Sequence, residues 1–172
     1  TNEILKNPAI LREYKGIALI NLYRMSDELV RILIDFRDSG GGLFIVGRTG
    51  LFDEYGNKNT TYLKRLLNVG NIWEEKKTCY RWSLIAGKDP LLEGIEGEKV
   101  GKGESFYYIP TFDYEREGYK VLGRLDDDPK IGTVGYRSKV VFWFPKIGLR
   151  KDGAKILEKF LRNLYDFYGI RE

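Results

Sequence analysis

The apolar positions of the first fifty residues change their spacing twice, which predicts two strands separated by a helix. Residues 16–21 form an apolar run of strand length. Ser26 is of the type that caps a helix, and the apolar residues after it recur at helical spacing: Leu29, Val30, Leu33 and Phe36. The glycines of residues 39–42 end this helix, and residues 43–46 form a second apolar strand. We therefore expect a βαβ unit whose strands are parallel neighbours with a right-handed crossover.

The later apolar runs predict a short helix, several strands and a long terminal helix. Thr60 or Thr61 can cap the short helix, whose apolar positions are Tyr62, Leu63, Leu66 and Leu67. Strand-like stretches follow at residues 80–85, 105–109, 120–125 and 139–144. From Asp152 to Tyr168 an apolar stripe repeats at helical spacing, and Gly169 stands where a helix-ending glycine belongs.

No repeat, low-complexity segment or linker interrupts this pattern, so residues 1–172 are predicted to form a single domain. A chain of this length can bury a sizeable core. The predicted fold class is α/β, with a mostly parallel, flavodoxin-like sheet and helices on both of its faces. The second half is expected to be more antiparallel, and the terminal helix is expected to cover the sheet.

The most informative feature of the composition is that the chain has no histidine and a single cysteine, Cys79. The usual general base, every Ser-His or Cys-His pair and the commonest metal ligand are therefore missing. One cysteine allows no intrachain disulfide. Cations flank Cys79 in KKTCYRW and could activate its thiol, but no partner base exists, and a small buried thiol is the alternative. We predict no catalytic residue, no cofactor and no metal ion.

The charge pattern argues against two classes of partner. The net charge is +4, but Lys and Arg are interspersed with Asp and Glu, whereas nucleic-acid binding needs a concentrated basic patch. No apolar run has the roughly 20 residues of a membrane span, and TNEILKNPAI does not resemble a signal peptide. We expect a cytoplasmic protein that binds neither nucleic acid nor membrane. Its richness in Lys and Glu, without Gln, is typical of thermophiles.

The turn after the second predicted strand holds the first candidate site, because ligands of open α/β sheets bind beyond the carboxyl ends of the strands. Arg48 could hold an anion, and Asp53 and Glu54 could serve as acids, bases or metal ligands. The structural alternative is that both acids pair with Arg48 or cap the turn, with Asn57 completing it. Thr49 is the only hydroxyl in the turn, and no base is recognisable beside it.

Two further segments each allow two interpretations. FYYIPTFDYE is rich in aromatic residues, and we predict that Phe106, Tyr107, Tyr108 and Phe112 lie at a subunit interface or cover the core rather than stack on a sugar. The run Asp126-Asp127-Asp128-Pro129 could attract a divalent cation, but a solvated turn closed by proline is the favoured interpretation.

The order of these features resembles the class I glutamine-amidotransferase-like fold. More closely, it resembles the form of that fold that serves as the trimerisation domain of family-42 β-galactosidases and related glycoside-hydrolase-like proteins. The matching positions are Asn21, Ser26-Asp27-Glu28, Gly41-Gly42, Thr49-Gly50, Asp53-Glu54 and Gly56. Farther along, DPLLEGIEG resembles a His-Pro-Leu segment of this fold with Asp89 in place of histidine, and VGYRSKVVFWFPKIG resembles the strand before its last helix.

The sequence departs from this fold in two ways. Active amidotransferases use a cysteine in a Gly-x-Cys-x-Gly elbow together with a distant His-x-Glu pair. Here the elbow reads Gly47-Arg48-Thr49-Gly50 and histidine is absent, so glutaminase activity is excluded. The fold also normally opens with a strand and a helix before residues 16–21. Either this unit is lost, or the chain is a piece of a longer protein, or a partner supplies it. An open sheet edge would favour self-association.

A resemblance that lacks both nucleophile and base favours a non-catalytic domain. It would act in homo-oligomerisation or as an accessory part of a carbohydrate-active protein, with a carbohydrate or a glycoside-hydrolase domain as partner. The alternative is a hydrolase or sugar-binding protein that uses the strand-end pocket. In that alternative Asp53 and Glu54 are the acids, Arg48 anchors the substrate, and Tyr107 or Tyr108 stacks on it.

Overall fold

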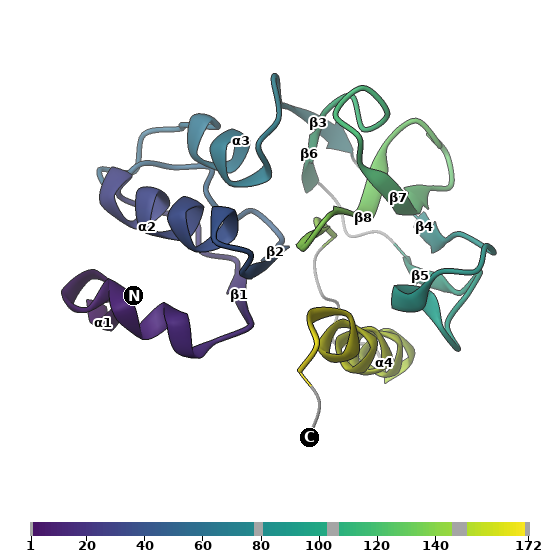
Figure 1. Cartoon of the computed structure of the whole chain (residues 1–172). Helices are drawn as coiled ribbons and strands as arrows, with labels where there is room; N and C mark the ends of the chain where they lie inside the picture. Colours follow the sequence, from purple (N-terminus) through teal and green to yellow (C-terminus); the bar gives the residue numbers. More distant parts are fainter. Residues whose placement is uncertain (1, 78–80, 103–106, 146–150, 171–172) are drawn as a thin grey trace.

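A seven-stranded mixed sheet, with helices on both faces, organises the chain in a computed structural model that describes residues 2–77, 81–102, 107–145 and 151–170 (Figure 1). The strands lie in the order β1 (Gly16–Ile20), β2 (Gly42–Val46), β9 (Val140–Trp143), β8 (Gly132–Arg137), β7 (Lys120–Leu125), β4 (Arg81–Leu84) and β5 (Lys99–Lys102). A separate antiparallel pair is formed by β3 (Trp73–Lys77) and β6 (Tyr107–Thr111). The helical segments are α1 (Asn2–Lys6), η1 (Pro8–Glu13), α2 (Asp27–Asp38), α3 (Thr61–Leu67), η2 (Pro90–Leu92) and α4 (Lys151–Tyr168).

The predicted βαβ unit is present. Strands β1 and β2 are parallel neighbours in register from Gly16 opposite Gly42 to Ile20 opposite Val46, and α2 connects them. Strand β9 lies parallel on the other side of β2. A strand that is covered on both faces is apolar throughout, and all five residues of β2 are buried.

Parallel pairing is limited to these three strands, so the described part of the sheet is less parallel than predicted. The pairs β9–β8, β8–β7, β7–β4 and β4–β5 are all antiparallel. The antiparallel second half is therefore confirmed and is larger than expected. Strands β3, β5 and β8 were missed because their sequences hide the period of two: WEEKK is polar, KVGK is short, and GTVGYR is interrupted by glycine.

Helix ends follow the predicted signals at three of four places, and α2 ends at Asp38 just before Gly40, which has a φ of +92°. The hydroxyl of Ser26 accepts a hydrogen bond from the Leu29 backbone N–H and caps α2. Gly169 ends α4 with a φ of +73°, and the backbone N–H of Ile170 donates to the Tyr165 carbonyl. At α3, Thr60 occupies the cap position but makes no side-chain cap bond. Instead, the Asn59 side chain accepts from the Thr61 N–H.

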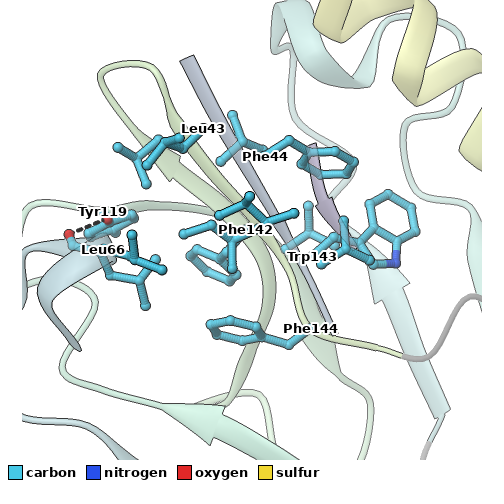
Figure 2. Packing of buried hydrophobic residues seen from close by; sticks show 14 of the residues in the cluster. Leu43, Phe44, Leu66, Tyr119, Phe142, Trp143 and Phe144 are labelled. Carbon is cyan, nitrogen blue, oxygen red and sulfur yellow. Dashed lines mark hydrogen bonds between the residues drawn. The ribbon is translucent and has the colours of Figure 1, made fainter. Parts of the chain in front are cut away.

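The core has an aromatic layer on each face of the sheet (Figure 2). On the face of α2 and α3, Phe142 packs against Phe112, Tyr119 and Phe144. On the opposite face, Trp143 meets Trp82 edge to face at 5.3 Å between ring centroids and Phe160 of α4 at 4.9 Å. Because neighbouring residues of a strand point to opposite faces, β9 supplies the centre of both layers. None of the helices in the described part of the chain combines the length and apolar character that crossing a bilayer requires.

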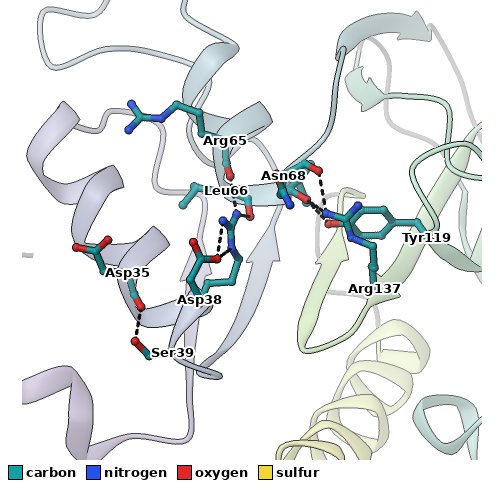
Figure 3. A network of polar contacts seen from close by, with 10 residues as sticks. Asp35, Asp38, Ser39, Arg65, Leu66, Asn68, Tyr119 and Arg137 are labelled. Carbon is teal, nitrogen blue, oxygen red and sulfur yellow. Dashed lines mark hydrogen bonds and ion pairs between the residues drawn. The ribbon is translucent and has the colours of Figure 1, made fainter.

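Two partly buried arginines hold the end of α3 in place (Figure 3). Arg37 of α2 donates to the carbonyls of Arg65 and Leu66, and Arg137 of β8 donates to the carbonyls of Leu67 and Asn68. These are the carbonyls at a helix end that have no partner inside the helix. The contacts fix the end of α3 to helix α2 and to strand β8.

Candidate functional site

The candidate site lies where β1 and β2 end. The loop after β1 runs beside the loop after β2: the Gly50 N–H donates to the Leu22 carbonyl, and the Phe52 N–H donates to the Tyr23 carbonyl. Phe52 also forms isolated β-bridges with Arg24 and Lys58. The two loops are therefore joined along their length and form one layer over the carboxyl edge of the parallel strands.

Thr49 is fully buried inside this layer and uses its hydroxyl to hold the backbone. Its Oγ1 accepts from the Leu22 N–H at 3.2 Å and lies 2.9 Å from the carbonyl oxygens of Leu19 and Val46. A hydroxyl that satisfies the ends of two strands and is closed to solvent cannot attack a substrate. Thr49 is a structural residue of the turn.

The backbone at the elbow position is shaped by glycine. Gly47 has a φ of +66°, and a Cβ placed on it would clash with the Asn21 side-chain oxygen. Asn21 itself has a φ of +47°. Glycine is thus required at Gly47 by both its conformation and the close approach of Asn21. The tight strand-to-loop turn of the predicted elbow is present without a nucleophile.

Arg48 pairs with Glu74 of β3. Its Nη2 lies 3.5 Å from one Glu74 oxygen, and Lys58 pairs with the other. The Glu74 side chain is only 4% exposed. The Arg48 guanidinium also lies over the Phe52 ring at 5.7 Å. Two cations from the loop therefore hold one buried carboxylate of the β3–β6 pair, which fixes that pair to the main sheet.

Asp53 and Asn57 form a closed turn of their own. One Asp53 oxygen accepts from the backbone N–H groups of Tyr55 and Asn57, and the other accepts from the Asn57 side-chain amide. The hydrogen bond from the Asn57 side chain, supported by those from the backbone, lowers the pKa of Asp53 below its ordinary value. A carboxylate stabilised in its ionised form is a poor general acid. Glu54 is exposed beside it.

The structure thus brings together only two of the five predicted site residues, Asp53 and Asn57, in the turn that was the structural alternative. The predicted pairing of Arg48 with Asp53 or Glu54 is replaced by its pairing with Glu74. Sequence reasoning missed Glu74 because the polar run WEEKK did not look like a strand. Within that run two glutamates are followed by two lysines, so no period of two marks Glu74 as a residue turned inward.

The predicted aromatic interface is only partly described by the structure. Phe106 lies outside the described residues, and Tyr107 and Tyr108 are part of β6 opposite Lys77 and Lys76. Phe112 is 2% exposed and contacts Tyr114, Tyr119 and Phe142. Of the two predicted interpretations, Phe112, just beyond β6, takes the one in which the aromatic residue covers the core.

Asp89, which replaces the histidine of the resembling fold, is also structural. One of its oxygens accepts from the Leu91 N–H and caps η2. The other lies 2.7 Å from the Lys120 ammonium and accepts from the Tyr136 hydroxyl. Burial raises the pKa of Tyr136, and the nearby Asp89 carboxylate raises it further. The Asp89 carboxylate therefore joins η2 to β7 and β8.

The other sequence candidates contribute no site among the described residues. Cys79 lies outside them. Asp126 accepts from the Ser83 hydroxyl, and Arg124 donates to the Pro129 carbonyl, so the aspartate run is a turn tied to its neighbours. In the described part of the chain no three acidic or sulfur side chains converge as metal ligands would. A groove of about 510 Å³ lies instead at the amino ends of the parallel strands, between η1, α2 and Lys139.

Comparison with known proteins extends these observations at the level of the fold. No family model and no curated protein matches the sequence. Among solved structures, a β-galactosidase from Rahnella sp. R3 superposes with a TM-score of 0.69 at 14% identity, over 92% of this chain and 23% of the enzyme. A GH42 β-galactosidase from G. stearothermophilus gives 0.67 at 15% identity, over 94% and 22%.

A shorter protein shares the same architecture. A Thermoplasma acidophilum protein assigned to GMP synthase superposes with a TM-score of 0.55 at 11% identity, over 95% of this chain and 79% of that one. This chain spans less than a quarter of the two galactosidases. The resemblance to family-42 β-galactosidases and to the amidotransferase-like fold, predicted from the sequence, is therefore confirmed for the fold.

Proposed function

We propose that this chain is a non-catalytic, amidotransferase-like domain that acts in oligomerisation or as an accessory part of a carbohydrate-active protein. The observation that carries the proposal is that the polar side chains at the strand ends bind other parts of the same fold. Thr49 bonds the backbone, Arg48 pairs with Glu74, and Asp53 closes its own turn. Each group is occupied in the fold, whereas a catalytic site needs groups directed at a substrate.

The likeness to segments of glycoside hydrolases supports the accessory role, because a domain of this fold occurs there within a larger enzyme. The open edge of the described sheet at β1 supports self-association, since an uncovered strand is a template for further pairing.

The proposal is tested by measuring mass and activity of the chain. Size-exclusion chromatography with light scattering at micromolar concentration is expected to give a multiple of the 20.0 kDa chain mass. Chromogenic galactosides and fucosides are expected to stay unhydrolysed. A monomer at all concentrations would contradict the oligomerisation role, and turnover that persists through purification would contradict the absence of catalysis.

Sugar binding by the same loop is the second candidate, favoured by the largely exposed Tyr55 beside exposed Glu54. An exposed aromatic ring next to a carboxylate is suited to stacking on a sugar and accepting from its hydroxyls. Replacing both Asp53 and Glu54 with alanine should abolish glycan-array signals if this candidate is correct. Unchanged signals would discard it and leave the accessory role.

A further inference from the structure

The unpaired side of β1 is an edge at which a further strand can add. The Gly42 N–H donates to the Lys15 carbonyl and the Asn21 N–H donates to the Val46 carbonyl, so the odd-numbered residues of this segment bond to β2. Because backbone groups alternate along a strand, the N–H and C=O groups of Gly16, Ala18 and Ile20 point to the open side. Among the described residues, the sheet order places no strand there.

The two edges of this sheet are protected differently. At the far edge, β5 reads KVGK, exposes Lys99, and pairs with β4 through a register shift. Lysines and irregular register are the devices by which edge strands avoid pairing with other chains. Strand β1 reads GIALI, has no charge, proline or bulge, and pairs with β2 in unbroken register. The β5 edge is therefore protected against pairing with another chain, and the β1 edge is suited to it.

The side chains of β1 add an apolar surface to this open edge. Ala18 is exposed, and Ile20 exposes 57% of its surface. On the same face, Gly16 has no side chain, and the ring of Tyr168 fills the space above it, 2.5 Å from where a Cβ would stand. The strand thus presents a large side chain at one end, a small one in the middle and a glycine covered by an aromatic ring at the other.

We propose that two copies of this chain pair through β1 in antiparallel orientation, about a two-fold axis at Ala18. In this register Ile20 of each copy lies opposite Gly16 of the other, and the two Ala18 residues face each other. The large end of one strand meets the glycine end of its copy, where Ile20 packs against the Tyr168 ring. β-Branched and aromatic neighbours are favourable across strands. A strand that is large at one end and small at the other is complementary to its own antiparallel copy.

Charge and layer geometry agree with this arrangement. The overlap from Gly16 to Ile20 is uncharged, and Lys15 falls opposite Asn21, so no like charges oppose each other. A two-fold axis through the sheet keeps α4 of both copies on one face and α2 of both on the other. Since α4 ends over Gly16 and Gly42, the two helix ends flank the seam and add to the buried area. The inference rests on the self-association in the proposed function and assigns the open edge of β1 as the surface through which the copies associate.

Charge substitutions at the axis test the pairing and its register. Ala18 is exposed, so Ala18→Asp and Ala18→Lys should both fold, which far-UV circular dichroism and the urea midpoint verify. Sedimentation equilibrium of the full chain is expected to give a dimer that each variant weakens at least about tenfold, because two like charges face each other. An equimolar mixture of the two variants should regain wild-type association through an Asp–Lys pair. Trp73→Lys, an exposed apolar residue on β3, should leave association unchanged.

The outcomes separate the two proposals. Wild-type association that survives both Ala18 variants overturns pairing through β1 and leaves oligomerisation through another surface intact. Loss of association in each variant without recovery in the mixture overturns the two-fold register at Ala18. A wild-type chain that is monomeric at every concentration overturns both this inference and the oligomerisation role.

Discussion

Single residues of the strand-end loop show that a polar side chain in the right place can serve the backbone alone. Thr49 and Asp53 occupy positions at which α/β proteins often carry chemistry. Their partners are backbone groups of β1, of β2 and of the loops that follow these strands, together with the Asn57 side-chain amide. The sequence identified these residues but not their roles. The Thr49 hydroxyl contacts the backbone of Leu19, Leu22 and Val46, and contacts with backbone atoms leave no signal in the residue types.

Replacing Thr49 with valine is predicted to destabilise the chain by about 1–3 kcal/mol. The change keeps the shape of the side chain but leaves the Leu22 N–H without its buried partner. Thr49→Ser keeps the hydroxyl and is expected to cost less. Urea unfolding followed by fluorescence measures both. Equal stability of valine and serine variants would show that the hydroxyl is not what holds the turn.

Removing the Glu74 side chain is predicted to lower the stability of the fold far more than removing the Glu54 side chain. Glu74→Ala leaves Arg48 and Lys58 without their shared carboxylate and is expected to cost about 2 kcal/mol, because Glu74 is the buried partner of both. Glu54→Ala removes an exposed side chain and should change stability by less than about 0.5 kcal/mol. The urea midpoints of the two variants check this. An unchanged urea midpoint for Glu74→Ala would mean that the β3–β6 pair is held by other contacts.

Secondary-structure elements were predicted where the apolar period was strong and missed where it was not. The βαβ unit and α4 follow their patterns closely, since most of their inward positions are apolar. Strands β3, β5 and β8 are stabilised by their neighbours in the sheet rather than by their own sequences. The end of α3 is similar, because its last carbonyls depend on Arg37 and Arg137 from other elements.

Replacing Arg137 with alanine is predicted to destabilise the chain by about 2 kcal/mol. Its guanidinium donates to the carbonyls of Leu67, Asn68 and Glu117 and lies 4.8 Å from the centre of the Tyr119 ring, and hydrogen bonds from a charged group are the stronger kind. Arg162→Ala is the matched control. Arg162 is 72% exposed in a helical pair with Glu158 and should contribute less than about 0.5 kcal/mol. Equal melting temperatures for the Arg137→Ala and Arg162→Ala variants would contradict this role of Arg137.

At the scale of the whole molecule, the two aromatic layers make stability dependent on alkaline pH. Burial raises the pKa of Tyr114 to about 12, and it raises the pKa values of Tyr119 and Tyr168 as well. Unfolded tyrosine ionises near pH 10. The folded state therefore keeps these protons longer than the unfolded chain. Their contribution is complete below about pH 10 and is lost as pH rises toward 12 and beyond.

We therefore predict cooperative alkaline unfolding above about pH 10, with the buried tyrosines ionising only as the chain unfolds. Ultraviolet difference titration in parallel with circular dichroism measures both events. Tyr55→Phe, at an exposed position, should leave the unfolding transition in place. Ionisation of all 12 tyrosines near pH 10 with the fold retained would contradict the prediction.

The sequence by itself determined the parallel unit, the terminal helix, the absence of a histidine-based mechanism and the resemblance in fold, because apolar period and residue type are local properties of the chain. The tertiary structure decided which strands complete the sheet, which carboxylate Arg48 holds and which edge of the described sheet stays open. These depend on partners far apart in the chain: Arg48 and Glu74 meet only once β3 is docked, and β1 becomes an edge only once the order of all seven strands is set.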